Sequence, residues 1–243
     1  MERIHSNIQR KSTYQIQSIM DENIKKYYPE GVTQREADEL FKKEWIRDFG
    51  VRLKMQQEGM ESIAGYGTTK HSFRIIVEEL PKLFKELDIK TMLDAACGDY
   101  YGMVDVDFTG VNYIGIDMVE EQIKFNKEKY PNVDFRNINM VTEELPIGDL
   151  VFARDVLVHN SDTNIKRFLK NCKDAEYKYL LTTTFPEVDN QELGGILGWR
   201  MLNFDKEPWG FTPIKIISEQ HDMNPEKCMG LYSLEDISNK VGL

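Results

Sequence analysis

The sequence predicts an α/β protein built on a doubly wound, mostly parallel sheet of seven strands, preceded by a helical extension. Short apolar runs typical of buried strands alternate with amphipathic segments typical of helices, which is the pattern of parallel strands joined by helical crossovers. Polar residues follow several of these runs, as expected where the carboxyl ends of strands hold a ligand. The sequence contains no internal repeat.

The first 64 residues are predicted to form the helical extension. Apolar residues recur at helical spacing between 16 and 27, and Thr33 with Glu36 matches a capping box. One apolar stripe follows, consisting of Ala37, Leu40, Phe41, Trp45 and Phe49. Core packing explains such a stripe, and a helical lid over a pocket is the functional alternative. We therefore predict an extension over 1–64 and the sheet domain over 65–243.

The helices of the sheet domain show clear start signals. The loop GYGTTKHS (65–72) offers Thr69 and Ser72 as caps, and Pro81 bends the helix that follows or starts another. Later helices are predicted over 118–130 and over 162–172, the second with Ser161 as its N-cap.

Seven runs have the character of strands. The five central ones are 91–96, 113–117, 133–138, 150–155 and 179–185. Two more are predicted near the C-terminus, PIKIISEQ over 213–220 and CMGLYSLEDI over 228–237. Strands separated by helices read as a parallel sheet, whereas the last two runs resemble a hairpin-like pair.

Composition and charge restrict the classes of function. The chain has 243 residues and a formal net charge of -10, which argues against a nucleic-acid partner. Cys97, Cys172 and Cys228 lack the spacing of metal ligands and are expected to be free thiols. The N-terminus has no signal-peptide core, and no stretch approaches the ~20 apolar residues of a membrane span. We expect a cytoplasmic chain without a metal or a membrane span.

The stretch LDAACGDYYG (93–102) follows the first strand and has small residues at Ala96 and Gly98, where backbone can approach a ligand closely. The dinucleotide fingerprint G-x-G-x-x-G is absent, and DYYGMVDVDF is a poor helix start for cradling phosphate. The loop therefore favours a cofactor without phosphates, bound next to Asp94.

The next two strand ends suggest an adenosine site. Asp117 ends the second strand, where a carboxylate can accept both ribose hydroxyls of an adenosine group; a helix N-cap is the alternative. Asn139 and Met140 follow the third strand and can contact an adenine edge and face, or they are an ordinary turn asparagine and a core methionine.

The fourth strand ends in ARDVLVHNS. Here His159 is a candidate general base, because an ordinary histidine titrates near ~6.5, although most histidines are structural. Asp155 is expected either to orient His159 or to bind a substrate hydroxyl. Arg154 lies beside them.

These motifs resemble the class I S-adenosylmethionine-dependent methyltransferases over residues 65–240. TMLDAACGDYYG is similar to their first motif, with Ala96 and Tyr100 in place of two glycines, YIGID to their second, and LVFARDVLVHNS to the motif of their fourth strand. The resemblance implies a seven-stranded sheet with an antiparallel last strand, S-adenosylmethionine as cofactor and S-adenosylhomocysteine as product. The cofactor-binding residues it implies are Tyr66, Thr68, Arg74, Asp94, Ala96, Gly98, Asp117, Met118, Asn139, Met140 and Arg154.

GYGTT, CGDYYGM, ARDVLVH, LLTTTF and GWRMLNFDKEPWGF further resemble a bacterial methyltransferase group associated with surface-polysaccharide (capsule) biosynthesis. This narrower resemblance implies that GYGTT and Arg74 approach the methionine end of the cofactor. It also implies that the segment 197–211 shapes the acceptor pocket, although Trp209 and Phe211 equally suit a buried aromatic loop. The substrate-binding residues we expect are Tyr101, Trp199, Arg200 and Asn203.

The expected function is O-methylation of a small or nucleotide-linked sugar, with His159 as the base and Asp155 assisting. An anionic acceptor, such as a phosphate, phosphoramidate or carboxylate, needs no base and would call on Arg154 or Arg200. Two other classes stay open: a nicotinamide-dependent oxidoreductase, which the missing glycines disfavour, and an inactive cofactor-binding partner subunit.

Overall fold

The computed structural model describes residues 34–193, 198–222 and 224–243. The helical spacing predicted between 16 and 27 and the capping residue Thr33 lie outside the described residues. Of the apolar stripe in the extension, only the side chains of Leu40 and Phe49 are described, and both are half-buried.

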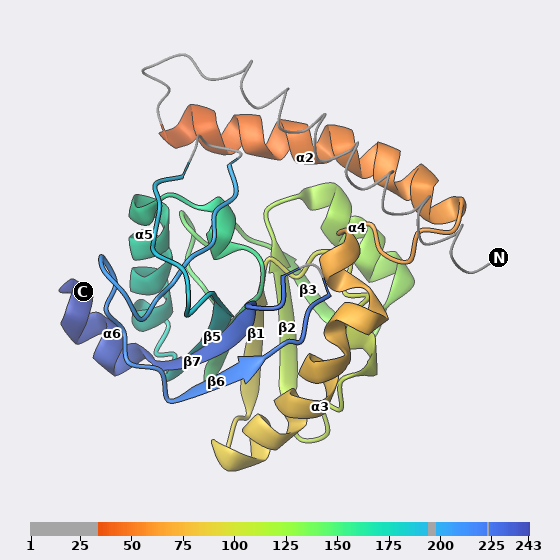
Figure 1. The fold of residues 1–243 in the computed structure, drawn as a ribbon. Helices are drawn as coiled ribbons and strands as arrows, with labels where there is room; N and C mark the ends of the chain where they lie inside the picture. The colour runs from red at the N-terminus through yellow and green to blue at the C-terminus, as the bar shows by residue number, and fades with distance from the viewer. Residues whose placement is uncertain (1–33, 194–197, 223) are drawn as a thin grey trace.

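The described strands form one seven-stranded sheet of order β3-β2-β1-β4-β5-β7-β6 (Figure 1). Its strands are β1 (Thr91–Ala95), β2 (Asn112–Asp117), β3 (Asp134–Asn137), β4 (Leu150–Ala153), β5 (Tyr179–Thr184), β6 (Lys215–Ser218) and β7 (Cys228–Ser233). Strands β1 to β5 pair in parallel, and β7 runs antiparallel to both β5 and β6. The predicted doubly wound, mostly parallel sheet is confirmed. It follows from the register that β6 points the same way as the parallel strands.

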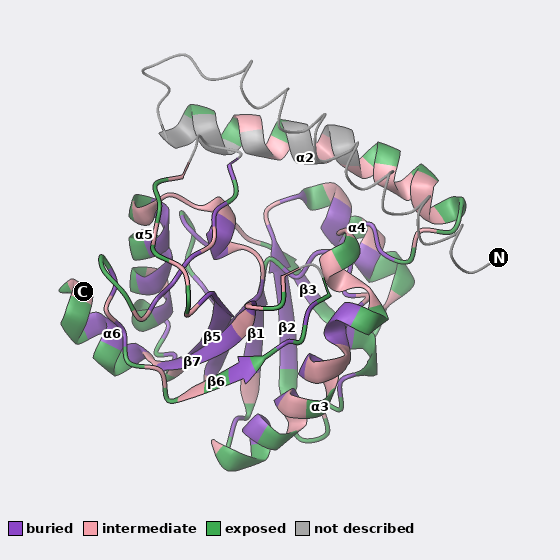
Figure 2. Ribbon diagram, viewed as in Figure 1, coloured by how far each residue is buried: buried purple, intermediate pink, exposed green. Residues whose placement is uncertain are grey.

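Helices cover both faces of this sheet. On one face α3 (Lys70–Glu86) and α4 (Glu120–Lys129) pack around Met92, Phe135 and Phe152. On the other face α5 (Asp162–Asp174) and α6 (Leu234–Val241) pack around alternate residues of the same strands. The strands are therefore mostly buried between the two helical layers, as Figure 2 shows.

Local capping sets several of these boundaries. Thr69 caps α3 by accepting from the Ser72 N–H, and Ser161 caps α5 in the same way, as predicted. Pro81 lies within α3 and starts no second helix. The predicted strand 228–237 is wrong in its second half: Ser233 caps α6, and acidic residues in its first turn suit a helix start.

The extension contributes α2 (Gln34–Gln57), which lies across the top of the molecule in Figure 1, above the loops that follow the parallel strands. The ring of Phe49 meets Phe125 of α4 edge-on at 6.0 Å, and Arg52 donates to the carbonyl oxygen of Ile63 at 3.3 Å. Helix α2 thus packs against α4 and the loop that precedes α3, and its role as a lid stays a prediction.

Candidate functional site

The loop after β1 is held in an unusual backbone conformation. Ala96, Gly98 and Tyr100 all have positive φ, at 49°, 52° and 61°, which is natural only for the glycine. Asp99 fixes the loop from one side by accepting from the Ile63 N–H at 2.8 Å. From the other side, the Asn126 amide of α4 donates to the Gly98 carbonyl at 2.7 Å. A short 3-10 turn over Met103–Asp105, rather than a long helix, follows the loop.

Tyr100, which stands where the family motif has a glycine, has a packing role. Its buried ring meets Tyr113 at 5.0 Å, Tyr130 at 5.1 Å and Phe135 at 5.4 Å, each edge-on. Edge-to-face rings of this kind stabilise beyond their buried area. The contacts explain how a tyrosine is retained in a left-handed conformation.

Two buried carboxylates lie at the ends of β1 and β2. Burial raises the pKa of Asp94 to about 7, against the opposing effect of the Tyr113 hydroxyl, which donates to it at 2.7 Å. Burial likewise raises the pKa of Asp117 to about 6, although the backbone N–H groups of Val119, Gly98 and Met118 favour its charged form. The N-cap of α4 is Val119, so the alternative role of Asp117 as that cap is wrong.

The residues after β3 have local roles. Asn139 accepts from the Val141 N–H at 2.9 Å through its side chain, which closes a turn. Met140 is buried in the core on the α5 side. Both alternatives from the sequence, a turn asparagine and a core methionine, are therefore present, while Met118 is half-buried beside Asp117.

The GYGTT loop packs against the end of β4. The Gly67 carbonyl accepts from Arg154 at 2.6 Å, and a Cβ on Gly67 would come within 3.1 Å of Asp155 Oδ2, so a glycine suits this close approach. Thr68 donates to the Gly65 carbonyl at 2.8 Å and hydrogen-bonds to Ser62, and the Tyr66 ring lies edge-on to His221 at 5.8 Å.

Arg74, a predicted cofactor-binding residue, donates to the Gln220 carbonyl at 2.7 Å and to the His71 carbonyl at 2.7 Å. Its guanidinium therefore ties α3 to the β6–β7 connection.

Arg154, Asp155, Glu219 and Lys227 form a compact set of alternating charges, called here the ionic cluster. Arg154 pairs with Glu219 at 2.5 Å and lies 3.3 Å from Asp155 Oδ2. Lys227 Nζ lies 2.5 Å from Asp155 Oδ2 and 3.5 Å from Glu219 Oε2. Although burial opposes it, the charges of Arg154 and Lys227 hold the pKa of Asp155 well below its usual range.

His159 lies just after β4, with a carbonyl group fixing its ring. Its Nδ1 lies 3.1 Å from the Gly198 oxygen; a carbonyl only accepts, so Nδ1 carries the proton and Nε2 keeps a lone pair. Burial lowers the pKa of His159, against smaller opposing effects of Gly198 and Asp155. The group that orients His159 is thus the Gly198 carbonyl, whereas Asp155 is held by Lys227, Arg154 and Thr183.

Sequence reasoning missed Glu219, His221 and Lys227. Because β6 is parallel to β5, its carboxyl end lies at the same edge of the sheet as His159, and β7 begins there. The expectation that ligands bind at the carboxyl ends of parallel strands, applied to the sixth strand as it was to the first four, would have found Glu219 and His221. No local pattern marks Lys227.

The predicted acceptor segment is only partly exposed. Trp199 is 43% exposed and meets Phe185 edge-on at 6.0 Å, next to the Gly198 carbonyl that holds His159. Asn203 is fully buried and donates to the Pro186 and Val188 carbonyls, so it organises the loop from inside.

Arg200 is also buried, and it binds Asp162 and the carbonyls of Asn160 and Gln191, which anchors the loop to the start of α5. Tyr101 contacts residues other than His159. The ammonium groups of Lys70 and Lys129 lie 5.5 and 5.8 Å from the centre of its ring.

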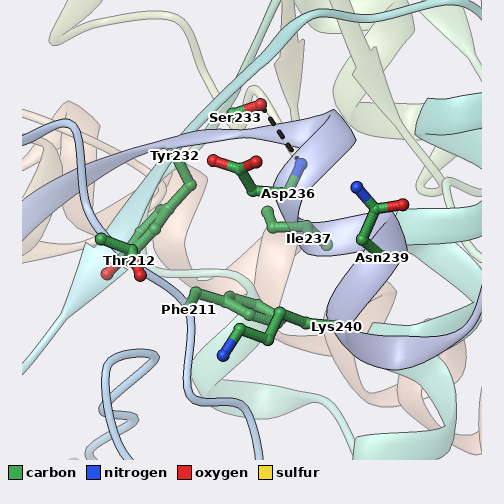
Figure 3. A pocket seen from close by; sticks show the side chains of 8 residues that line it. All are labelled: Phe211, Thr212, Tyr232, Ser233, Asp236, Ile237, Asn239 and Lys240. Atoms are coloured by element: carbon green, nitrogen blue, oxygen red, sulfur yellow. Dashed lines mark hydrogen bonds between the residues drawn. The ribbon is translucent and has the colours of Figure 1, made fainter.

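A separate pocket of about 470 Å³ lies between β7 and α6 (Figure 3). Phe211, Tyr232, Asp236 and Lys240 are among its lining residues. The end of β7 pairs with Tyr179 at the start of β5, so this pocket is at the opposite edge of the sheet from His159. It therefore does not belong to the candidate site.

Among the described residues, no three His, Cys, Asp or Glu side chains gather in a way that could hold a metal ion. None of the helices in the described ranges combines the length and apolar character needed to cross a membrane.

Solved methyltransferases have a similar architecture. A 1,6-didemethyltoxoflavin N1-methyltransferase of Burkholderia thailandensis, solved with S-adenosylhomocysteine, matches with a TM-score of 0.60 at 11% identity, covering 85% of this chain and 92% of that one. Human N-acetylserotonin methyltransferase with S-adenosylmethionine gives 0.56 at 13% identity, covering 84% and 60%. This chain has the Rossmann-like class I methyltransferase fold.

Magnesium protoporphyrin IX methyltransferase of Synechocystis PCC 6803, solved with S-adenosylmethionine, gives a TM-score of 0.52 at 13% identity, covering 68% of this chain and 79% of that one. Comparison of the sequence with protein-family models and with curated proteins finds no match. The similarity is therefore one of fold, and the chemistry has to be argued from the site.

Proposed function

We propose that this protein is an S-adenosylmethionine-dependent O-methyltransferase whose acceptor is the hydroxyl group of a sugar. The observation that carries the proposal is His159: a half-buried imidazole just after β4, with its Nδ1 proton directed to a carbonyl and its Nε2 lone pair available. A neutral, oriented imidazole suits a general base for a hydroxyl nucleophile.

The residues at the ends of β1 and β2 fit the cofactor. Asp117 is a carboxylate whose pKa is raised by burial in spite of three backbone N–H donors, and a pair of ribose hydroxyls would further stabilise its charged form. Asp94 and the left-handed turn at Ala96 and Gly98 border the same edge. S-adenosylmethionine would supply there a methyl group on a positively charged sulfur.

His159 would accept the hydroxyl proton as the acceptor oxygen attacks, and Asp155 would stabilise the imidazolium that forms. The Gly198 carbonyl keeps the ring in one orientation throughout. Holding the attacking oxygen in line with the methyl group contributes a large part of such catalysis. The products are a methyl ether, S-adenosylhomocysteine and a proton released from His159.

The contacts of the two arginines weigh against an anionic acceptor. Arg154 is used by Glu219, Asp155 and Gly67, and Arg200 by Asp162 and two carbonyls, so an incoming anion would have to displace internal partners. Trp199, which is 43% exposed and follows the glycine whose carbonyl holds His159, offers a stacking surface for a sugar ring. Together with the sequence resemblance, this supports a nucleotide-linked sugar of surface-polysaccharide assembly as the acceptor.

Substitution of His159 by alanine tests the proposal. With S-adenosylmethionine and a panel of nucleotide-linked sugars, release of S-adenosylhomocysteine should fall ~100-fold or more in His159→Ala, the usual contribution of a general base. Cofactor affinity, measured by calorimetry, should stay within about threefold, because His159 is not among the residues that fit the cofactor. Nearly full turnover in His159→Ala would refute the hydroxyl acceptor.

A further inference from the structure

The ionic cluster contains two cations and two carboxylates, of which the proposed reaction uses only the carboxylate of Asp155. Arg154 and Lys227 are each 3% exposed and Glu219 is fully buried, whereas the Asp155 side chain is 34% exposed. Asp155 is therefore the member through which the cluster faces the site. Charges buried this deeply persist only when they are paired, and removing one partner is costly.

The members come from distant parts of the chain. Asp155 follows β4, whereas Glu219 and Lys227 stand at the two ends of the β6–β7 connection. The backbone at Asp155 is left-handed, with φ of 58°, and its N–H donates to Thr183 at 2.8 Å. Thr183 of β5 therefore fixes the backbone of Asp155, and Lys227 fixes the Oδ2 atom of its carboxylate.

We propose that Lys227 and Glu219 are positioning residues of the transfer site: Lys227 holds the Asp155 carboxylate beside His159, and Glu219 holds Lys227. The inference rests on the proposed role of His159 as the base. The Lys227 ammonium pairs with Asp155 and Glu219 and not with His159, so it acts through Asp155 rather than as a catalytic residue.

The charges around His159 make this role measurable. Asp155 favours the protonated ring and Arg52 of α2 disfavours it. The charges of Arg154, Asp155 and Glu219 act on Lys227. All four members of the ionic cluster, Lys227 included, act on His221. Lys227 offsets the negative charge of Asp155, so its removal should strengthen the field that favours protonated His159. Removal of the Glu219 charge should weaken it.

The experiment follows the protonation of His159 by NMR, which is practical because the chain has four histidines. Lys227→Met should raise the midpoint of the His159 titration by about half a pH unit or more, and Glu219→Gln should lower it. The double variant should lie near wild type if the charges act as one network. Lys170→Met removes the lysine of an exposed ion pair on α5 and serves as the matched control, with no shift expected.

Turnover gives the second measurement. Lys227→Met should lower kcat ~10-fold or more with little change in KM for the cofactor, and Lys227→Arg should recover most of the loss. Shifts of the same sign in Lys227→Met and Glu219→Gln, or none, would overturn the inference. So would Lys227→Arg being as impaired as Lys227→Met. If Lys227→Met does not fold, Lys227→Arg and Glu219→Gln still decide it.

The NMR titration needs no acceptor, so it separates the two claims. A wild-type protein that transfers no methyl group to any sugar contradicts the proposed function, whatever the titration shows. A wild-type protein that is active, with a His159 titration insensitive to both substitutions, contradicts only the role of Lys227 and Glu219.

Discussion

Replacing Asp117 with asparagine should separate cofactor binding from folding. Burial raises the pKa of this carboxyl from 3.8 to about 6. A shift of roughly two units corresponds to about 3 kcal/mol of penalty on the charged form in the folded protein. The folded pKa is raised, so the folded state holds the proton more tightly than the unfolded state. Stability from this group therefore declines as pH rises from about 4 to 6.

At pH 8 the variant loses a charged acceptor for the ribose hydroxyls, and each such bond contributes about 1.5–3 kcal/mol. Affinity for S-adenosylhomocysteine should therefore fall ~10- to 100-fold or more. Folding should change little, because relief of the buried charge offsets the weaker acceptance from the Val119 N–H, which is 3.0 Å away. Wild-type affinity should also weaken as pH falls through 6, and the variant should lack this dependence.

Isothermal titration calorimetry between pH 5 and 8, with thermal unfolding of the free protein, measures both effects. Asp174→Asn, on the exposed face of α5, is the matched control. An Asp117→Asn protein that binds within about threefold of wild type, or that keeps the pH dependence near 6, would refute a ribose-binding role for Asp117.

Two further substitutions test the loop after β1. Tyr100→Gly restores the glycine of the family motif, yet it should destabilise the protein by roughly 2–3 kcal/mol, because the loss of a buried aromatic ring exceeds the ~1 kcal/mol of relieved left-handed strain. Urea unfolding measures the free energy of unfolding, and a variant as stable as wild type would contradict the packing role of Tyr100. Tyr113→Phe removes the hydroxyl that donates to Asp94 and lowers its pKa, so the pKa of Asp94 should rise above about 7. Carboxyl ¹³C NMR follows the titration of Asp94, and an unchanged midpoint would show that the hydroxyl bond has no electrostatic effect.

The places of the residues that follow β1 to β4 could be predicted because they follow from local sequence. Each strand from β1 to β4 is a short apolar run, and the residue after it lies at a known edge of the sheet. Asp94, Asp117 and His159 were found in this way. The same reasoning could not place Tyr100, since its ring is held by Tyr113, Tyr130 and Phe135, which lie up to 35 positions away in the sequence.

The partners of the two buried arginines escaped prediction because they are remote in the sequence and lie in segments without periodicity. Arg154 and Arg200 read as free cations in the sequence, yet one meets Glu219, 65 residues away, and the other meets Asp162, 38 residues away. A buried guanidinium needs such partners, so the sequence could have predicted that each arginine is paired but not with which acid. The pairing has a chemical consequence. With both arginines paired internally, the proposed acceptor would face the imidazole of His159 and the carboxylate of Asp155, which suit a hydroxyl group better than an anion.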